Sequence, residues 1–275
     1  MAIITISRGS YSHGKRIAER VAKQLGYECV SREIILEASK DFNIPEYKLS
    51  NALKESPSII DRIILYRKEK YVAFIKAALL KIFKSDNIVY HGFAGHFFVK
   101  DIPHVFKIRI TAGIEDRVKL VMDRENIPKN EALRLINKLD EERIKWGQHL
   151  YGINTWDPAL YDLVIHIKRI TIDNAVGIIC DNVGLEQFQT TPASLQEMED
   201  LSLASEAKAA IIDLKPDIDV SAQKGVIYVK MKAPQLKDTG LLVQGMRKRI
   251  DNIPGVKDMK IDVIPPITPI WNNPI

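Results

Sequence analysis

Residues 1–25 constrain the fold most, because they combine a short apolar run, a glycine-bearing loop and an amphipathic segment. Ile3–Ile6 is predicted to be a buried strand. The loop after it has Gly-x-x-x-x-Gly-Lys spacing from Gly9 to Lys15, and the helix predicted beyond it stops at Gly26. Backbone N–H groups at a helix N-terminus, with one lysine, form a site for phosphate groups. This layout predicts a phosphate-binding P-loop; an ordinary strand–turn–helix with a surface lysine is the alternative.

The candidate nucleotide-binding loop departs from the usual pattern at its last position. A Ser or Thr hydroxyl usually follows the loop lysine and binds Mg²⁺, whereas this chain has Arg16, which cannot coordinate a cation. Three interpretations stay open: Mg²⁺ is held by water and other groups, Arg16 supplies charge to a phosphate, or the site is degenerate. The candidate nucleotide-binding residues are Gly9, Ser10, Tyr11, Ser12, His13, Gly14, Lys15 and Arg16.

Beyond the loop, predicted strands alternate with predicted helices, which favours a parallel sheet covered on both faces. We therefore expect a three-layer α/β domain of the P-loop NTPase class with a five-stranded parallel sheet. The predicted strands are Ile3–Ile6, Tyr27–Val30, Asn87–Tyr90, Val105–Ile110 and Leu163–Ile167. After the first helix, the predicted helices are Arg32–Ser39, Ile59–Phe83, Ile114–Arg124, Asn130–Trp146 and Ile172–Cys180.

The composition changes after residue 185. Residues 186–202 are polar and carry Thr, Pro and Ser, which is typical of a linker. Residues 203–265 follow the order α-β-β-α-β and predict a small α+β domain, with a helix over Leu203–Leu214 at its start. Residues 266–275 are too rich in proline for regular structure. The expected domains are thus 1–185 and 203–265, joined by the linker and followed by the tail.

Composition limits the partners and the compartment. The net charge of +5 suits anionic ligands without requiring nucleic acid, and we expect no nucleic-acid partner. Cys29 and Cys180 are interpreted as reduced, buried thiols. No apolar run approaches the roughly 18 residues of a membrane span, so we expect a cytoplasmic protein. His91, His96 and His104 lack the spacing of a metal site, and we interpret them as surface or loop histidines; no metal site is predicted.

Several segments of residues 1–183 share their order and spacing with one known family. They are ITISR at 4–8 with GKRIA at 14–18, LGY at 25–27 with SREII at 31–35, the segments 86–95 and 111–118, DEER at 140–143 with YG at 151–152, and DP at 157–158 with YDLVI at 161–165. In this order they resemble the cytidylate-kinase-like family of P-loop nucleoside monophosphate kinases. Such kinases move the γ-phosphoryl group of ATP to CMP or dCMP, so the resemblance implies ATP and Mg²⁺.

The resemblance also implies roles for individual residues. Loop N–H groups near Gly14 would hold the donor phosphates, and Lys15 would bridge the β- and γ-phosphates. Arg143 would grip phosphate as a second catalytic cation, with Asp140 on the same helix face; a surface ion pair between these two is the alternative. The residues implied on the acceptor side are Ser31, Arg32, Gly92 and Arg117. For Arg32, a surface position at a helix start is the alternative.

Two further positions depart from the family pattern. Where the family has the arginine of its GRGA loop, this chain has Phe93. Where the family has an aspartate before the position of Arg32, this chain has Ser31. Together with Arg16, they suggest a second hypothesis, in which the chain binds nucleotides as a sensor or regulator but transfers phosphate poorly or to another acceptor. A structural scaffold with an empty loop is a third.

The C-terminal segment resembles a BON domain in its element order and its glycines, Gly225 and Gly255. The resemblance implies a small ligand or a phospholipid surface as partner, and the local excess of Lys and Arg would attract phospholipid headgroups. A solvated face on a purely structural appendage is the alternative. An RNA-binding KH interpretation lacks its Gly-x-x-Gly loop.

Overall fold

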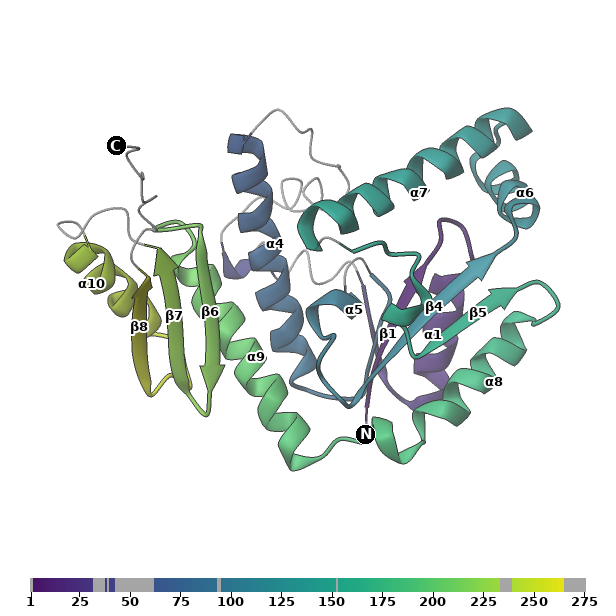
Figure 1. The fold of residues 1–275 in the computed structure, drawn as a ribbon. Coiled ribbons are helices and arrows are strands. Elements are labelled where there is room, and N and C mark those ends of the chain that lie inside the picture. The colour runs from purple at the N-terminus through teal and green to yellow at the C-terminus, as the bar shows by residue number, and fades with distance from the viewer. Residues whose placement is uncertain are drawn as a thin grey trace, which may run out of the picture. The chain divides into compact units, whose positions relative to one another are not determined.

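The structure is a computed structural model that describes residues 2–31, 38, 40–42, 62–92, 95–151, 153–232 and 239–264. The chain divides into two compact units, Met1–Met198 and Glu199–Ile275. The predicted helix Arg32–Ser39 and the proline-rich tail lie largely or wholly outside the described residues. Each unit has its own sheet (Figure 1).

The first unit is built on a five-stranded sheet in the order β2-β3-β1-β4-β5, and every neighbouring pair is parallel. This confirms the predicted fold class. Because β1 lies in the middle, the loop after it opens at the centre of the carboxyl edge, where α/β sheets bind ligands. The strands are β1 (Ile3–Arg8), β2 (Glu28–Val30), β3 (Ile88–Tyr90), β4 (Val105–Ala112) and β5 (Leu163–Ile167).

Helices cover both faces of this sheet. On one side lie α1 (Gly14–Leu25) and α8 (Ile172–Val183), and on the other lie α4 (Arg62–Phe83) and the short α5 (Gly95–Phe98) (Figure 1). Helix α1 buries Ile17, Ala18 and Val21 and ends at Gly26, whose φ of 70° is left-handed. Two short 3₁₀ helices, Pro158–Leu160 and Glu186–Phe188, precede β5 and follow α8.

The two faces of the central strands differ in chemistry. Side chains alternate along a strand, so Ile108 and Ile110 of β4 join the apolar core under α1 and α8. Lys107 and Arg109 belong to the opposite face, where they pair in register with Thr5 and Ser7 of β1. This face of two buried strands is therefore polar, which is unusual for a parallel sheet covered on both sides.

A helical hairpin formed by α6 (Ile114–Glu125) and α7 (Lys129–Tyr151) follows β4. Its core is Val118 and Val121 of α6 against Ala132 and Ile136 of α7. Helix α7 extends beyond the predicted end at Trp146. The hairpin carries Arg117, Asp140 and Arg143, so its packing decides where these charged side chains meet the sheet.

The second unit has the predicted order of elements. Its elements are α9 (Pro192–Ile211), which begins before the boundary between the units, β6 (Ile218–Gln223), β7 (Val226–Lys232), α10 (Thr239–Ile250) and β8 (Asp258–Ile264). Strand β7 lies between antiparallel β6 and parallel β8. The sheet packs Ile227 and Val229 against Met246 of α10 and Ala207 of α9 in an apolar core.

Helix α9 begins inside the segment that we predicted to be a linker. The Thr191 hydroxyl accepts a hydrogen bond from the Ser194 N–H (3.1 Å), the Ser194 hydroxyl accepts one from the Thr191 N–H (3.0 Å), and Pro192 takes the first helical position. Thr, Pro and Ser at this spacing are helix-start signals, which the linker interpretation overlooked. Met198 is then buried within the segment.

Two smaller expectations concern the cysteines and the membrane. Neither Cys29 nor Cys180 is part of a disulfide, and both are half-buried rather than fully buried. Within the described ranges, no helix combines the length and the apolar character that crossing a bilayer requires.

Candidate functional site

The loop between β1 and α1 is fastened to the end of β4. The Gly9 N–H donates to the Ile110 carbonyl at 3.1 Å. The Ser12 hydroxyl lies 2.9 Å from the Gly9 carbonyl and 3.1 Å from the Ile110 carbonyl, so it closes the turn from inside. Tyr11 and His13 adopt left-handed backbone angles, with φ of 56° and 64°. Successive turns of this kind aim backbone N–H groups at one point, as anion-binding loops do.

Gly14 is required by close packing against the strand. A Cβ atom at this position would lie 2.8 Å from both Cβ and Cδ of Arg8. The first turn of α1 carries Lys15 and Arg16 and no acidic residue. The N–H groups of a first turn lack partners within the helix, so this end of α1 favours a negatively charged ligand.

The peptide of Ser10 is held on both sides by an ion pair from the α6–α7 hairpin. Arg117 Nε donates to the Ser10 carbonyl at 2.6 Å, and the Ser10 N–H donates to Asp140 Oδ1 at 3.2 Å. Arg117 Nη2 and Asp140 Oδ2 are 2.6 Å apart, and the two side chains are only 7% and 14% exposed. The alternative raised from the sequence was a surface ion pair between Asp140 and Arg143. In the structure, Asp140 instead pairs with Arg117 across the hairpin, and this pair is buried. Asp140 and Arg117 thus position the loop.

Arg143 lies one helical turn after Asp140 and reaches the end of β1. Its Nη1 donates to the Arg8 carbonyl at 2.8 Å. Burial, followed by the nearby charge of Arg8, lowers the pKa of Arg143 to about 10, and Asp140 partly opposes this. Burial and then the charge of Arg124 lower the pKa of Arg8. These cations are therefore crowded, and an anionic ligand would relieve their repulsion.

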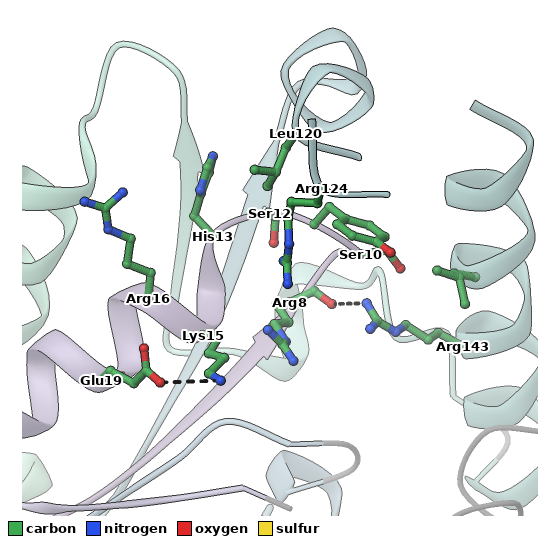
Figure 2. Close-up of a pocket in the computed structure, with 12 residues that line it drawn as sticks. Arg8, Ser10, Ser12, His13, Lys15, Arg16, Glu19, Leu120, Arg124 and Arg143 are labelled. Atoms are coloured by element: carbon green, nitrogen blue, oxygen red, sulfur yellow. Dashed lines mark hydrogen bonds and ion pairs between the residues drawn. The ribbon is translucent and has the colours of Figure 1, made fainter. Parts of the chain in front are cut away.

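A pocket of about 570 Å³ opens above the loop and α1 (Figure 2). Among the residues lining it, five are Lys or Arg and Glu19 alone is acidic, so the pocket suits a ligand with several negative charges. The predicted nucleotide-binding residues Ser10 to His13, Lys15 and Arg16 contribute to its wall. The cationic wall consists of Arg8, Lys15, Arg16, Arg124 and Arg143.

Lys15 points along α1 rather than over the loop. Its Nζ is 3.6 Å from Glu19 Oε1, and its side chain is 64% exposed (Figure 2). Exposed pairs at i,i+4 contribute only about 0.3–0.5 kcal/mol. A phosphate group in the pocket can therefore replace Glu19 as the partner of Lys15.

The position after Lys15 does not fit a Mg²⁺ ion held in the usual P-loop manner, because Arg16 offers no oxygen there. In the part of the chain that the structure describes, no three His, Cys, Asp or Glu side chains gather as metal ligands. The side chains that this site offers to a negatively charged ligand are those of arginine and lysine.

Of the predicted acceptor-side residues, Ser31 and Gly92 lie at neighbouring strand ends, whereas Arg117 lies in α6 and pairs with Asp140. Ser31 directly follows β2, and Gly92 lies two residues after β3. A Cβ at Gly92 would overlap the Tyr90 ring, with its hydroxyl oxygen only 2.0 Å away, so the chain passes directly across that ring. Arg32 and Phe93 lie outside the described residues. Gly92, Ser31 and the loop thus share one edge of the sheet.

A buried polar network on the sheet face opposite α1 was missed by the sequence analysis. The Tyr161 hydroxyl lies 2.9 Å from the Thr155 carbonyl, 3.2 Å from Ser7 Oγ and 3.2 Å from His96 Nε2. Arg109 Nη1 donates to the same hydroxyl at 3.3 Å. The available signal was the alternation along β4, where Lys107 and Arg109 interrupt the apolar residues.

The histidines after β3 are buried, so their interpretation as surface side chains is wrong, although His91 and His104 do lie in loops. His91, His96 and His104 are 4%, 6% and 0% exposed. Burial, followed by the charges of Arg109 and Lys107, lowers the pKa of His96 to about 3. His96 is therefore neutral near pH 7 and takes part in the network as an uncharged ring.

Comparison with known proteins gives one consistent result. Residues 3–169 match the model of the cytidylate kinase-like family. The cytidylate kinase of Desulfurococcus amylolyticus is 30% identical over 168 residues, which cover 59% of this chain and 82% of that protein. The cytidylate kinase of Thermococcus kodakarensis is 28% identical over 178 residues, covering 64% and 85%. An uncharacterized protein from Eubacterium ventriosum has a similar fold, with a TM-score of 0.51 and 21% identity over 66% of this chain and 98% of its own.

Proposed function

Because the chain belongs to the cytidylate kinase-like family, we propose that it transfers the γ-phosphoryl group of ATP to CMP, dCMP or a related nucleoside monophosphate. The observation that carries this proposal is the cationic pocket of about 570 Å³ built on the loop at the centre of the sheet edge. Phosphoryl transfer depends on positioning and on neutralising charge on the phosphoryl oxygens. The pocket offers both.

The donor phosphates bind at the loop and the first turn of α1, and Lys15 turns from Glu19 to the β- and γ-phosphates. A phosphate oxygen of the acceptor attacks the γ-phosphorus, the bond to the β,γ-bridging oxygen breaks, and ADP leaves. Arg8, Arg124 and Arg143 neutralise the charge on the transferred group and on the leaving oxygen. Arg117 and Asp140 act indirectly, because they fix the Ser10 peptide and with it the loop.

A panel of nucleoside monophosphates incubated with ATP and Mg²⁺ tests the proposal. We expect transfer to CMP or dCMP, and we expect Lys15→Met to lower kcat by about 10²- to 10³-fold, as the loss of one charge-stabilising group does. Lys23→Met is the matched control, since Lys23 is exposed in the last turn of the same helix. Absence of transfer to every acceptor would contradict the proposal.

The departures at Arg16, Ser31 and Phe93 favour a second candidate, a nucleotide-binding regulator without transfer. Its output would come from the second unit, for which the BON-like assignment stays a prediction. Helix α10 there carries Arg247, Lys248 and Arg249 in its last turn, and Leu241 is 76% exposed near its start. These side chains suit an anionic headgroup or small anionic ligand. ATP binding by calorimetry without transfer to any acceptor would favour this candidate over the kinase.

A further inference from the structure

Arg109 is a buried arginine whose charge is not balanced by a carboxylate. Arg109 as a whole residue is 5% exposed. Its Nη1 donates to Ser7 Oγ at 3.4 Å and to the Tyr161 hydroxyl at 3.3 Å, and both partners are neutral. No ion pair joins Arg109 to an acid within the described residues. Burying a charge without an opposite charge costs free energy, so this position calls for an anion.

The neighbouring cations already have opposite charges or carbonyl groups as partners. Lys107 lies 3.9 Å from Asp162, and Arg117 lies 2.6 Å from Asp140. Arg143 donates to the Arg8 carbonyl. Among these side chains, Arg109 is thus the one whose hydrogen bonds within the described residues reach neither a carboxylate nor a carbonyl group.

Two aromatic rings lie near the guanidinium group of Arg109. Its central carbon lies 5.0 Å from the ring centre of Trp156 and 5.6 Å from that of Tyr161. Such contacts stabilise a cation only in part. Trp156 is 45% exposed, so one ring that solvent reaches lies over the charge. A ligand can therefore approach Arg109 from the side of Trp156.

The place of Arg109 in the sheet relates it to the reacting groups. It is the register partner of Ser7, the residue before Arg8, and Arg8 lines the donor pocket. Arg109 does not line that pocket; it lies with His96 of α5, which follows the end of β3. Arg109 is nevertheless close enough to interact electrostatically with Arg143, because its charge contributes to lowering the pKa of Arg143. Arg109 is therefore near the donor site and lies on the sheet face that α5, the helix after β3, covers.

The segment after β3 lacks a cation of its own. Residues 92–95 read Gly-Phe-Ala-Gly, so no side chain there can bind a phosphate by charge. An acceptor phosphate at this edge would carry two negative charges close to the donor's. Positive charge has to come from another element, and Arg109 of β4 is one source.

We propose that Arg109, assisted by the Ser7 and Tyr161 hydroxyls, binds the phosphate group of the acceptor nucleotide. This inference rests on the proposed kinase function and adds the residue that holds the acceptor. It makes Arg109 a binding residue, and Trp156 the ring that must shift when the acceptor enters.

The test measures CMP and a non-hydrolysable ATP analogue separately by calorimetry. The proteins are the full chain, Arg109→Met, Arg109→Lys and, as a matched control, Arg20→Met, which removes an exposed arginine that pairs with Asp173. We expect Arg109→Met to weaken CMP binding about 10- to 100-fold, the value of a charge-assisted contact, and to leave binding of the ATP analogue within about twofold. Arg109→Lys should recover part of the loss, and Arg20→Met should match the unchanged chain.

Each outcome separates this inference from the proposed function. If the unchanged chain binds CMP and Arg109→Met binds it equally well, the inference is wrong and the kinase proposal stands. Equal losses for CMP and the ATP analogue would also overturn it, because they indicate a purely structural role. If the unchanged chain binds neither nucleotide, both fail. Should Arg109→Met not fold, Arg109→Lys decides, with a selective loss of CMP affinity expected and unchanged affinity for both ligands contradicting the inference.

Discussion

The two faces of the central sheet are made by the same strands and are held by different forces. Toward α1 and α8, Ile108 and Ile110 of β4 pack in a continuous apolar core. Toward Tyr161 and α5, Arg109 of the same strand lies among hydroxyls and neutral rings, and Lys107 lies 3.9 Å from Asp162. The first face specifies the fold through close packing. Among the described residues of the second face, a charge lacks an opposite charge and some polar atoms lack hydrogen bonds. This lowers the stability of the fold and leaves these groups able to bind a ligand.

This difference has a local cause in the sequence. In β4, every second residue from Phe106 to Ala112 is apolar, and the residues between them are Lys107, Arg109 and Thr111. A parallel strand covered on both faces usually has an unbroken apolar run. The alternation therefore indicates that one face of β4 serves apolar packing and the other serves polar contacts.

The largest effect is expected on the apolar face. Ile108→Ala should lower the free energy of unfolding by about 3 kcal/mol, because it removes a fully buried side chain and leaves a cavity. Urea unfolding measures this, with Val164→Ala on β5, where Val164 is 43% exposed, as the control. At temperatures where the variant is folded, its KM values for both nucleotides should not change. A selective change in one KM would contradict the claim that the apolar face affects stability and not nucleotide binding.

A smaller effect is expected from pH on the polar face, through His96. Its pKa is about 3 in the folded chain, owing first to burial, and about 6.5 when unfolded. Below pH 6.5 the unfolded chain binds a proton that the folded chain excludes, so stability falls as the pH drops from 6.5 toward 3. At pH 5 the loss amounts to about 2 kcal/mol.

The measurement compares the free energy of unfolding at pH 7.5 and pH 5 for the unchanged chain and for His96→Gln. Taking the difference between the two pH values cancels any pH-independent effect of the substitution. The variant should lose less stability on acidification by about 2 kcal/mol. An identical loss in both proteins would show that another group governs acid sensitivity.

The same division explains what could be predicted from the sequence. Apolar periodicity and glycines gave the strand, loop and helix of residues 3–26, because these signals are local. The pairing of Arg117 with Asp140 joins two helices across the hairpin and has no local signal. The buried histidines and the partners of Arg109 likewise depend on which strands become neighbours. The start of α9 was available in Thr191 and Pro192 and was interpreted as a linker.

The smallest effect tests whether unsatisfied polar atoms weaken the polar face. The Thr5 hydroxyl lies on this face, 1% exposed, and forms no hydrogen bond with another residue that the structure describes. Thr5→Val keeps the shape and removes the hydroxyl, so it should raise the free energy of unfolding by about 1 kcal/mol. Thr111→Val on β4 is the matched control; its hydroxyl lies 3.4 Å from the Ile165 carbonyl, and its loss should lower stability by about 0.5–1 kcal/mol. Opposite signs in urea unfolding would support the comparison. Equal destabilisation by both substitutions would mean that the hydroxyl of Thr5 is satisfied in solution, and that Arg109 remains as the one unbalanced group of the described polar face.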